Sequence, residues 1–383
     1  MPSSLTVLWP KVVAPDIEEL RFSYDFCGRL SKQLCKEASP GSSWVEYTGD
    51  QAIEELLPLI DTDMALVVTE PEIVISPSAV KGLTKCLETG YGICGPVYNQ
   101  TTFPHQTAPL PVPYVDMGTY LEMAAALAER EESHHVAADT LDPACVLYRV
   151  MLLKELPEQT LFSDAPGFIA KMRSNISAVA TCALVHRGFK NDFERDDLVR
   201  LVPEGVKRVL DMGCAMGGYG RTLKQLYPDI FLTGVELNPI MAQSAGRYYD
   251  EIIRCHAEEA NLAETFDLVN CGDFLEHLRD PWRMLKQIHR LLRHDGGYLV
   301  ISIPNVGHWS IVRDLLQGRF QYVPSGLLCV THLRWFTESS IRTALADAGF
   351  SIEVFQREHI PPTPRGEQFI SQMCTTGYGD EKS

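Results

Sequence analysis

The sequence lacks three features that would assign a protein quickly to a class. No apolar run approaches the roughly 18 residues that span a bilayer, and no basic region precedes the first apolar residues, so we expect neither membrane insertion nor a signal peptide. None of the 11 cysteines lies in a Cys-x-x-Cys pair, and we expect no metal site. Basic residues are scarce, with 34 Lys and Arg against 50 Asp and Glu, so we expect no nucleic-acid partner.

The sequence does contain enough apolar material for folded cores. Of its 383 residues, 45% are hydrophobic and 22% are charged, which excludes a disordered or fibrous chain. The scattered cysteines favour buried free thiols in a reducing compartment, so we expect a cytoplasmic protein. The charged segment 190–197 carries no apolar period and predicts a domain boundary. We therefore expect an α/β domain over residues 1–188, a second α/β domain over 189–360 and a Pro-containing polar tail over 361–383.

Residues after this boundary alternate between strand-like and helix-like segments. Apolar runs predict strands at 206–212, 230–236, 251–255, 266–271, 297–303 and 350–355. Helical periodicity predicts helices at 217–227, 239–249, 281–293 and 338–348. Such alternation is typical of a Rossmann-like, doubly wound parallel sheet, which binds ligands at the carboxyl ends of its strands. The only candidate for a further strand is 368–374. In the first domain, short strands are predicted at 5–8, 64–68 and 93–97.

A glycine-rich turn, VLDMGCAMGGYG, stands where the first strand of the second domain meets its helix. Gly213 and Gly217 allow a tight turn and close approach of a ligand, and Glu236 ends the next strand, where a carboxylate can accept both hydroxyls of a ribose. The alternative is a purely structural turn. Ala215 breaks the dinucleotide fingerprint, and no Lys-Ser or Lys-Thr follows as in a phosphate loop. Asp211 instead suits a ligand with an ammonium and a sulfonium, which indicates S-adenosylmethionine.

The pattern Asp211-x-Gly213-Cys214-x-x-Gly217 resembles the first motif of class I S-adenosylmethionine-dependent methyltransferases. Further segments follow in that family's order: FDLV at 266–269, LEHLRDP at 275–281, LLRHDGGYL at 291–299, and IPN, HW and THLRWFT between 303 and 337. The last group is similar to a branch often found beside glycan-building enzymes. The resemblance covers about residues 195–358 and implies S-adenosylmethionine as the cofactor.

The resemblance also implies which residues bind the cofactor. Asp211, Gly213 and Gly217 would hold the methionine end, Glu236 the ribose, and Leu237 the adenine face. His256 stands where the family usually has an Asp that contacts the adenine amino group, and a neutral imidazole accepts that hydrogen bond in only one tautomer. The full expected set is Asp211, Gly213, Cys214, Gly217, Glu236, Leu237, His256, Ala257 and Cys271.

Two histidines are candidate catalytic residues. Methyl transfer to a hydroxyl gains from a group that takes the proton, and the ordinary pKa of histidine suits that task. His277 opens the helix after the fourth strand, and His332 follows the variable stretch 317–330, so the two can converge over the cofactor. We expect one to be the base and the other to orient the acceptor. A capping or structural role is the alternative for each.

Residues 1–188 faintly resemble the GT-A fold of nucleotide-sugar glycosyltransferases. The similarity lies in LIDTD at 59–63 with Glu70 and Glu72 after it, and in the segment 142–149. Glu70-Pro-Glu72 is a poor match to the Asp-x-Asp metal motif of that fold. We therefore expect a degenerate domain that transfers no sugar and docks a glycan or a partner, with a structural domain as the alternative.

These features predict a methyltransferase whose acceptor is a hydroxyl of a sugar or glycan intermediate. Two alternatives stay open. One is methyl transfer to oxygen, nitrogen or sulfur of a small metabolite or natural product. The other is a non-catalytic binding or scaffold protein with a vestigial cofactor fold, against which the intact Asp211, Gly213 and Glu236 argue. The sequence leaves the oligomeric state open.

Overall fold

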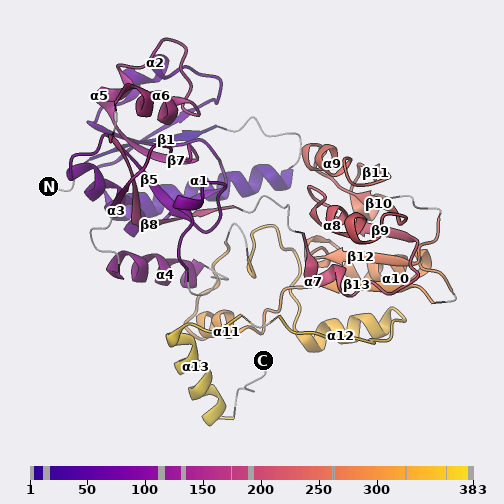
Figure 1. Ribbon diagram of the computed structural model, residues 1–383. Coiled ribbons are helices and arrows are strands. Elements are labelled where there is room, and N and C mark those ends of the chain that lie inside the picture. Colours follow the sequence, from indigo (N-terminus) through magenta and orange to yellow (C-terminus); the bar gives the residue numbers. More distant parts are fainter. Residues whose placement is uncertain are drawn as a thin grey trace. The chain divides into compact units, whose positions relative to one another are not determined.

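The computed structural model describes residues 4–11, 18–110, 117–130, 135–173, 175–188, 194–260, 262, 264–294, 296–323, 326–358 and 360–377. The chain divides into two compact units (Figure 1). Unit 1 comprises Met1–Gly188 with Tyr322–Ser325, and unit 2 comprises Phe189–Gln321 with Gly326–Ser383. Each unit is built on a sheet of its own.

Unit 1 contains a mixed sheet of eight strands. Their order is β2-β1-β3-β7-β5-β8-β4, with β6 paired to β8. β1 is parallel to β2 and β3, whereas β7 is antiparallel to both of its neighbours, β3 and β5. The three strands expected from the sequence correspond to β1, β3 and β5. The strands are β1 Thr6–Pro10, β2 Ser43–Tyr47, β3 Met64–Val68, β4 Ile73–Ile75, β5 Ile93–Tyr98, β6 His135–Ala137, β7 Cys145–Arg149 and β8 Ser177–Arg187.

The helices of unit 1 include one with clear start signals. α3 begins after Ser76, whose hydroxyl accepts a hydrogen bond from Ala79 N at 3.1 Å, and Pro77 occupies its first position. The α-helices are α1 Glu18–Ala38, α2 Ile53–Leu56, α3 Pro77–Glu88, α4 Met117–Arg130, α5 Val150–Leu153 and α6 Ala165–Met172, and the 3₁₀ turns are η1 Leu57–Leu59 and η2 Pro104–Gln106.

An ion-paired cluster lies at the end of β8. The guanidinium of Arg187 donates to both oxygens of Glu70 and, at 2.7 Å, to Asp142. The Asp142 side chain is 2% exposed and that of Arg187 is 10% exposed, so this charge pair is buried. Glu70 belongs to the segment that the sequence marked as a degenerate metal motif. A metal ion would therefore have to displace Arg187 before it could bind the carboxylates of Glu70 and Asp142.

We predict that Arg187→Met lowers the free energy of unfolding of unit 1 by about 3–5 kcal/mol, because the buried Asp142 is left charged and unpaired. Arg173→Met is the control, since it breaks an exposed ion pair with Glu155 and should cost less than about 1 kcal/mol. Urea-dependent hydrogen exchange of peptides from β7 and β8 measures unit 1 separately from unit 2. Equal losses in the two variants would contradict a stabilising role for the buried cluster.

Unit 2 contains five parallel strands in the order β11-β10-β9-β12-β13. The sequence predicted strands at all five places, and their parallel pairing confirms the Rossmann-like doubly wound sheet. The strand order reverses between β9 and β12, the switch point at which such sheets bind ligands. The strands are β9 Arg208–Met212, β10 Phe231–Val235, β11 Glu251–Ile253, β12 Leu268–Gly272 and β13 Tyr298–Ser302.

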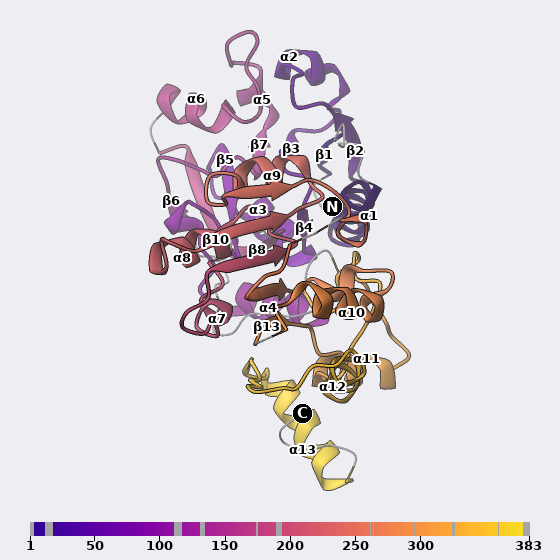
Figure 2. The ribbon, with the colours of Figure 1, turned by 90° about the vertical axis from the view of Figure 1, so that its right-hand side faces the viewer.

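Helices cover both faces of this sheet. The places of these helices around the sheet can be followed in Figures 1 and 2. Side chains of β9 alternate between the faces: Val209 packs with α7 and α8, and Leu210 packs with α10 and α12. Both residues are fully buried, so the sheet has an apolar core on each side. The helices are α7 Asp196–Val199, α8 Gly218–Leu226, α9 Pro239–Ala245, α10 Pro281–Leu291, α11 Trp309–Leu316, α12 Glu338–Asp347 and α13 Pro364–Thr375, with 3₁₀ turns η3 Ala257–Glu259 and η4 Leu275–His277.

The strand expected at 350–355 was wrong. This segment is irregular, and its side chains contact α12 instead of extending the sheet. The guanidinium of Arg342 lies 3.8 Å from the ring centroid of Phe355, and Arg357 donates to both oxygens of Glu338. Contacts with the preceding helix therefore outweigh the β-propensity of this short apolar run.

The strand candidate at 368–374 was also wrong, because these residues lie within α13. Thr363 caps this helix by accepting a hydrogen bond from Gly366 N, and Pro364 occupies its first position. These local signals start a helix before the apolar residues are reached.

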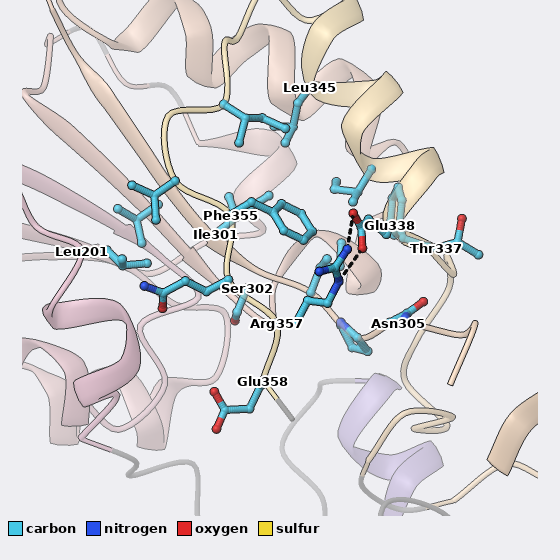
Figure 3. Close-up of a pocket in the computed structure, with 18 of the residues that line it drawn as sticks. Leu201, Ile301, Ser302, Asn305, Thr337, Glu338, Leu345, Phe355, Arg357 and Glu358 are labelled. Carbon is cyan, nitrogen blue, oxygen red and sulfur yellow. Dashed lines mark hydrogen bonds and ion pairs between the residues drawn. The ribbon is translucent and has the colours of Figure 1, made fainter. Parts of the chain in front are cut away.

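A cavity of about 1550 Å³ follows the outer edge of β13, which has no strand partner there among the described residues. Ile301 and Ser302 line it from β13, and Phe355 lines it from the segment after α12 (Figure 3). The ion pair of Arg357 and Glu338 borders it, as the dashed lines in Figure 3 show. The glycine turn does not contribute to this lining.

Two further expectations concern the whole chain. All 11 cysteines lie in the described ranges, where they form no disulfide, and eight of them are buried. Within those ranges, no helix is long and apolar enough to cross a membrane.

Candidate functional site

The glycine turn and η4 emerge at the switch point of the unit 2 sheet. The turn follows β9 and η4 follows β12, and these strands are neighbours, with Asp211 opposite Asn270 in the ladder. Parallel strands present their carboxyl ends at one edge of a sheet. The expected residues of the turn and His277 therefore belong to segments that leave the same edge side by side.

Backbone hydrogen bonds and a close helix contact shape the turn. The N–H groups of Gly213 and Cys214 donate to the carbonyl of Val235 at 2.9 and 3.1 Å, which ties the turn to β10. Gly217 has a φ of +91°, and a Cβ at this position would lie 2.9 Å from Cα of Ala245. A glycine is therefore required at 217 for both conformation and space.

The carboxylate of Glu236 is held beside this turn by two backbone donors. Ala215 N donates to one oxygen at 2.9 Å and Asn238 N to the other at 2.8 Å. Ala215 adopts a left-handed φ of +47°, a strained conformation for a residue with a Cβ. Burial raises the pKa of Glu236, and the backbone bonds oppose this shift. The half-buried carboxylate is thus fixed at the end of β10, where the sequence placed a ribose contact.

The carboxylate of Asp211 lies beneath the turn with only 2% of the residue exposed. Tyr249 donates its hydroxyl to one oxygen, and Asn270 donates its amide to the other at 2.7 Å. Burial raises the pKa of Asp211 to about 6, although both hydrogen bonds favour the ionised form. The Oδ1 atom of Asn270 has no hydrogen-bond partner, which leaves an acceptor beside this carboxylate.

These contacts decide which kind of ligand the turn fits. A pyrophosphate needs free N–H groups at such a turn, but Glu236 already accepts the N–H of Ala215. Asp211 and Glu236 add two carboxylates, and in the described part of the chain neither forms an ion pair with Lys or Arg. The turn therefore repels a diphosphate and suits a positively charged ligand, in agreement with an ammonium and a sulfonium.

The remaining expected cofactor residues occupy different surroundings. Leu237 follows Glu236 and is half-buried, as are His256, which precedes η3, and Ala257, which begins it. Cys214 and Cys271 are buried, and Cys271 packs in the apolar cluster on the α10 side of the sheet. Burial raises the pKa of both thiols, so they behave as small apolar side chains.

The structure brings His277 and His332 together. Their ring centroids are 4.8 Å apart at an interplanar angle of 84°. Nδ1 of His277 lies 3.2 Å from the carbonyl of Thr331, and Nδ1 of His332 lies 3.1 Å from that of Leu327. A carbonyl only accepts, so Nδ1 donates in both rings and Nε2 carries the lone pair in the neutral form.

Glu276 completes this cluster, and the sequence had not marked it as a site residue. It is 1% exposed, and Oε1 lies 3.9 Å from Nε2 of His332. Among the described residues, neither of its carboxyl oxygens has a hydrogen-bond partner. Burial raises the pKa of Glu276 well above its ordinary value. Burial lowers the pKa of His332 to about 3, which makes His332 a weak base.

A further group at the same edge was not expected from the sequence. Arg195 donates to Asp197, to Asp273 at 3.0 Å and to the hydroxyl of Ser302 at 2.8 Å. Asp273 follows β12 directly and has a positive φ of +47°. Polar residues at the carboxyl ends of apolar strands were the signal that could have indicated Asp273, which follows β12, and Ser302, which ends β13.

Comparison with known proteins shows what unit 2 is similar to. A family profile described as a methyltransferase domain matches residues 185–353. This match supports an S-adenosylmethionine-dependent methyltransferase activity for the region. The ubiquinone biosynthesis O-methyltransferase of Psychrobacter arcticus is 26% identical over 200 residues, which is 45% of this chain and 69% of that protein. The enzyme of the same name from Coxiella burnetii is 29% identical over 137 residues, 31% of this chain and 54% of its own length.

Two solved structures also match part of this chain. A methyltransferase from Archaeoglobus fulgidus, described as SAM-dependent, is 23% identical, covers 40% of this chain and 66% of its own, and has a TM-score of 0.32. The sugar N-methyltransferase KedS8 from Streptoalloteichus is 26% identical and covers 31% of this chain and 51% of its own, with a TM-score of 0.27. The chain thus spans between about half and two thirds of the length of these relatives.

We predict that Gly217→Ala destabilises unit 2 by about 2–4 kcal/mol, through a left-handed conformation and a clash with Ala245. Gly205→Ala is the control, because Gly205 has a similar φ of +85° with nothing within 4 Å of its Cβ position. That variant should lose only the conformational part, about 1–2 kcal/mol. Hydrogen exchange of peptides from β9 and β10 in urea measures both losses. Equal values would rule out the clash.

Proposed function

We propose that unit 2 transfers the methyl group of S-adenosylmethionine to a hydroxyl of a sugar or glycan intermediate. The observation that supports this most is the pair of carboxylates, Asp211 and Glu236, at the switch point of the sheet. The names of the curated relatives support an oxygen acceptor. The choice of a sugar or glycan as the acceptor rests on a sequence resemblance. The motifs between residues 303 and 337 resemble a branch of the methyltransferase family that is often found beside glycan-building enzymes.

In this proposal the two carboxylates bind different ends of the cofactor. Glu236 accepts the ribose hydroxyls through the lone pairs that Ala215 and Asn238 leave free. Asp211, with Asn270 Oδ1 beside it, attracts the ammonium and sulfonium end by charge. S-adenosylmethionine supplies an electrophilic methyl carbon, and the carbon–sulfur bond breaks with its electron pair retained on sulfur as the acceptor oxygen attacks.

Glu276, His277 and His332 form the acceptor side in the same proposal. Glu276 and His277 follow β12, the neighbour of β9, so their segment leaves the sheet next to the glycine turn. His332 lies on a later segment, after α11, and packs against His277. His277 is exposed at this edge, whereas Glu276 and His332 are buried behind it. We assign the histidines to the acceptor oxygen and not to the cofactor.

Glu236→Gln should weaken S-adenosylmethionine binding by about 1–3 kcal/mol, because an amide accepts fewer and weaker hydrogen bonds from a ribose than a carboxylate does. Glu251→Gln on β11 is the matched control and should bind as the wild type does, since Glu251 is exposed away from the turn. Titration calorimetry of both variants gives the comparison. Unchanged affinity in Glu236→Gln would remove the ribose assignment.

The buried Asp211 predicts a pH dependence. Its pKa rises on folding from an ordinary value near 4 to about 6, so the folded state holds this proton more tightly than the unfolded state. The stabilising contribution is complete below about pH 4 and is lost as pH rises through about 6, for a total of roughly 3 kcal/mol. In Asp211→Asn this slope disappears from the stability profile of the cofactor-free protein. Denaturation between pH 4 and 8 tests it, and identical slopes in both proteins would contradict the shift.

Separate experiments test the acceptor side. His277→Ala and His332→Ala should each lower kcat by about 10²-fold or more while cofactor affinity stays unchanged. His289→Ala is the control, an exposed histidine on α10 outside the cluster. Transfer of labelled methyl to sugar, phenol and amine acceptors measures kcat and identifies the acceptor class. Full activity in both cluster variants would remove the histidines from the reaction.

A further inference from the structure

The cluster of Glu276, His277 and His332 has the arrangement of a metal site. One possible ligand atom from each residue lies within 4.8 Å of the others. A four-coordinate cation with bonds of about 2.0–2.2 Å holds its ligand atoms roughly 3.4 Å apart. Small side-chain movements would therefore bring the three groups to coordination distance.

The hydrogen bonds of the two imidazoles agree with this arrangement. Histidines that bind a metal through one ring nitrogen usually donate the other N–H to a carbonyl or carboxylate, which fixes the tautomer and the ring. Here Nδ1 of His277 donates to Thr331, and Nδ1 of His332 donates to Leu327. Nε2 is left as the ligand atom in each ring, and that of His332 already faces Glu276.

The carboxyl group of Glu276 is the second, independent observation. It is almost fully buried, yet neither oxygen has a hydrogen-bond partner in the part of the chain that the structure describes. A buried polar group without a hydrogen-bond partner destabilises the folded state, and more so when it is charged. The backbone carbonyl of the same residue accepts bonds from Leu333 and Arg334, so η4 is well anchored and the side chain is held in place. A cation is the partner that this group lacks.

We propose that Glu276, His277 and His332 bind one divalent transition-metal cation of the Zn²⁺ type at the carboxyl edge of β12. Two imidazoles and one carboxylate form the donor set of open zinc sites, whereas Mg²⁺ prefers oxygen donors alone. The exposed side of His277 leaves the fourth position accessible. The sequence did not predict this site, because its ligands come from two segments that are 55 residues apart, as the separation of His277 and His332 shows.

The metal site rests on the proposed function for its role and deepens it. A hydroxyl of the acceptor bound to the cation becomes more acidic and gives its proton to water, and the resulting oxygen attacks the methyl carbon. In this arrangement both histidines are ligands, and neither needs to take the proton. The cation thus replaces the base that the sequence led us to expect.

Binding of Zn²⁺ alone tests the proposal on the full chain without cofactor. After treatment with a chelator, equilibrium dialysis against ZnCl₂ should give one tightly bound ion per chain. Glu276→Gln, His277→Gln and His332→Gln should each weaken binding about tenfold or more, and His289→Gln should not. His277 is exposed, so its variant is expected to fold even if a buried variant does not. Unchanged binding in these cluster variants, or no bound ion in the wild type, would overturn the site.

Two further measurements test the identity of the ligands and of the ion. Bound Co²⁺ should show no thiolate charge-transfer band, because none of the three ligands is a cysteine; such a band would place the ion on the free thiols. A large excess of Mg²⁺ should not displace Zn²⁺, and ready displacement would contradict the donor set. Methyl transfer is assayed separately in the same preparations. If Zn²⁺ binds as described but no methyl transfer is detected, the result counts against the proposed function and leaves the metal site standing.

Discussion

The organisation of unit 2 depends on the burial of one carboxylate. Asp211 lies in a central strand with both faces of the sheet covered, so its oxygens need donors from within the protein. Tyr249 comes from the chain after α9, and Asn270 comes from the neighbouring strand β12. The same hydrogen bonds therefore link three separate segments at the point where the strand order reverses, and the glycine turn begins two residues later. The hydrogen-bonded carboxylate of Asp211 therefore connects the sheet with the candidate site, and we call it the polar anchor.

Much of unit 2 was predictable because its signals are local. Apolar runs bounded by polar turns gave the five strands, and Gly217 marked a turn that no other residue fits. The anchor itself was not predictable, since Tyr249 meets Asp211 across 38 residues through tertiary packing alone. In β12 the resemblance favoured Cys271, whereas the adjacent Asn270 bonds Asp211, because successive side chains of a strand point to opposite faces.

The expected strand at 350–355 shows a different limit of sequence reasoning. An apolar run forms a strand only when it pairs with the edge of a sheet, and here Phe355 of this run packs against Arg342 of α12 instead. The cluster at Glu276 shows a third limit, because a lone acidic residue before a histidine carries no sign that both oxygens are buried without partners. In unit 1 the acidic motif at Glu70 was visible in the sequence, but its ion pair with Arg187 was not, because the two residues meet only in the folded structure.

The two carboxylates beside the glycine turn also bear on turnover. Methyl transfer converts a sulfonium into a neutral thioether, so the ligand loses one positive charge. The negative charges of Asp211 and Glu236 stay the same. Charge attraction in a partly buried site is strong, and its loss weakens the hold on the spent molecule more than on the fresh one. In the proposed function, the acidic turn would therefore bind the donor more tightly than its by-product, which favours exchange of one for the other after every cycle.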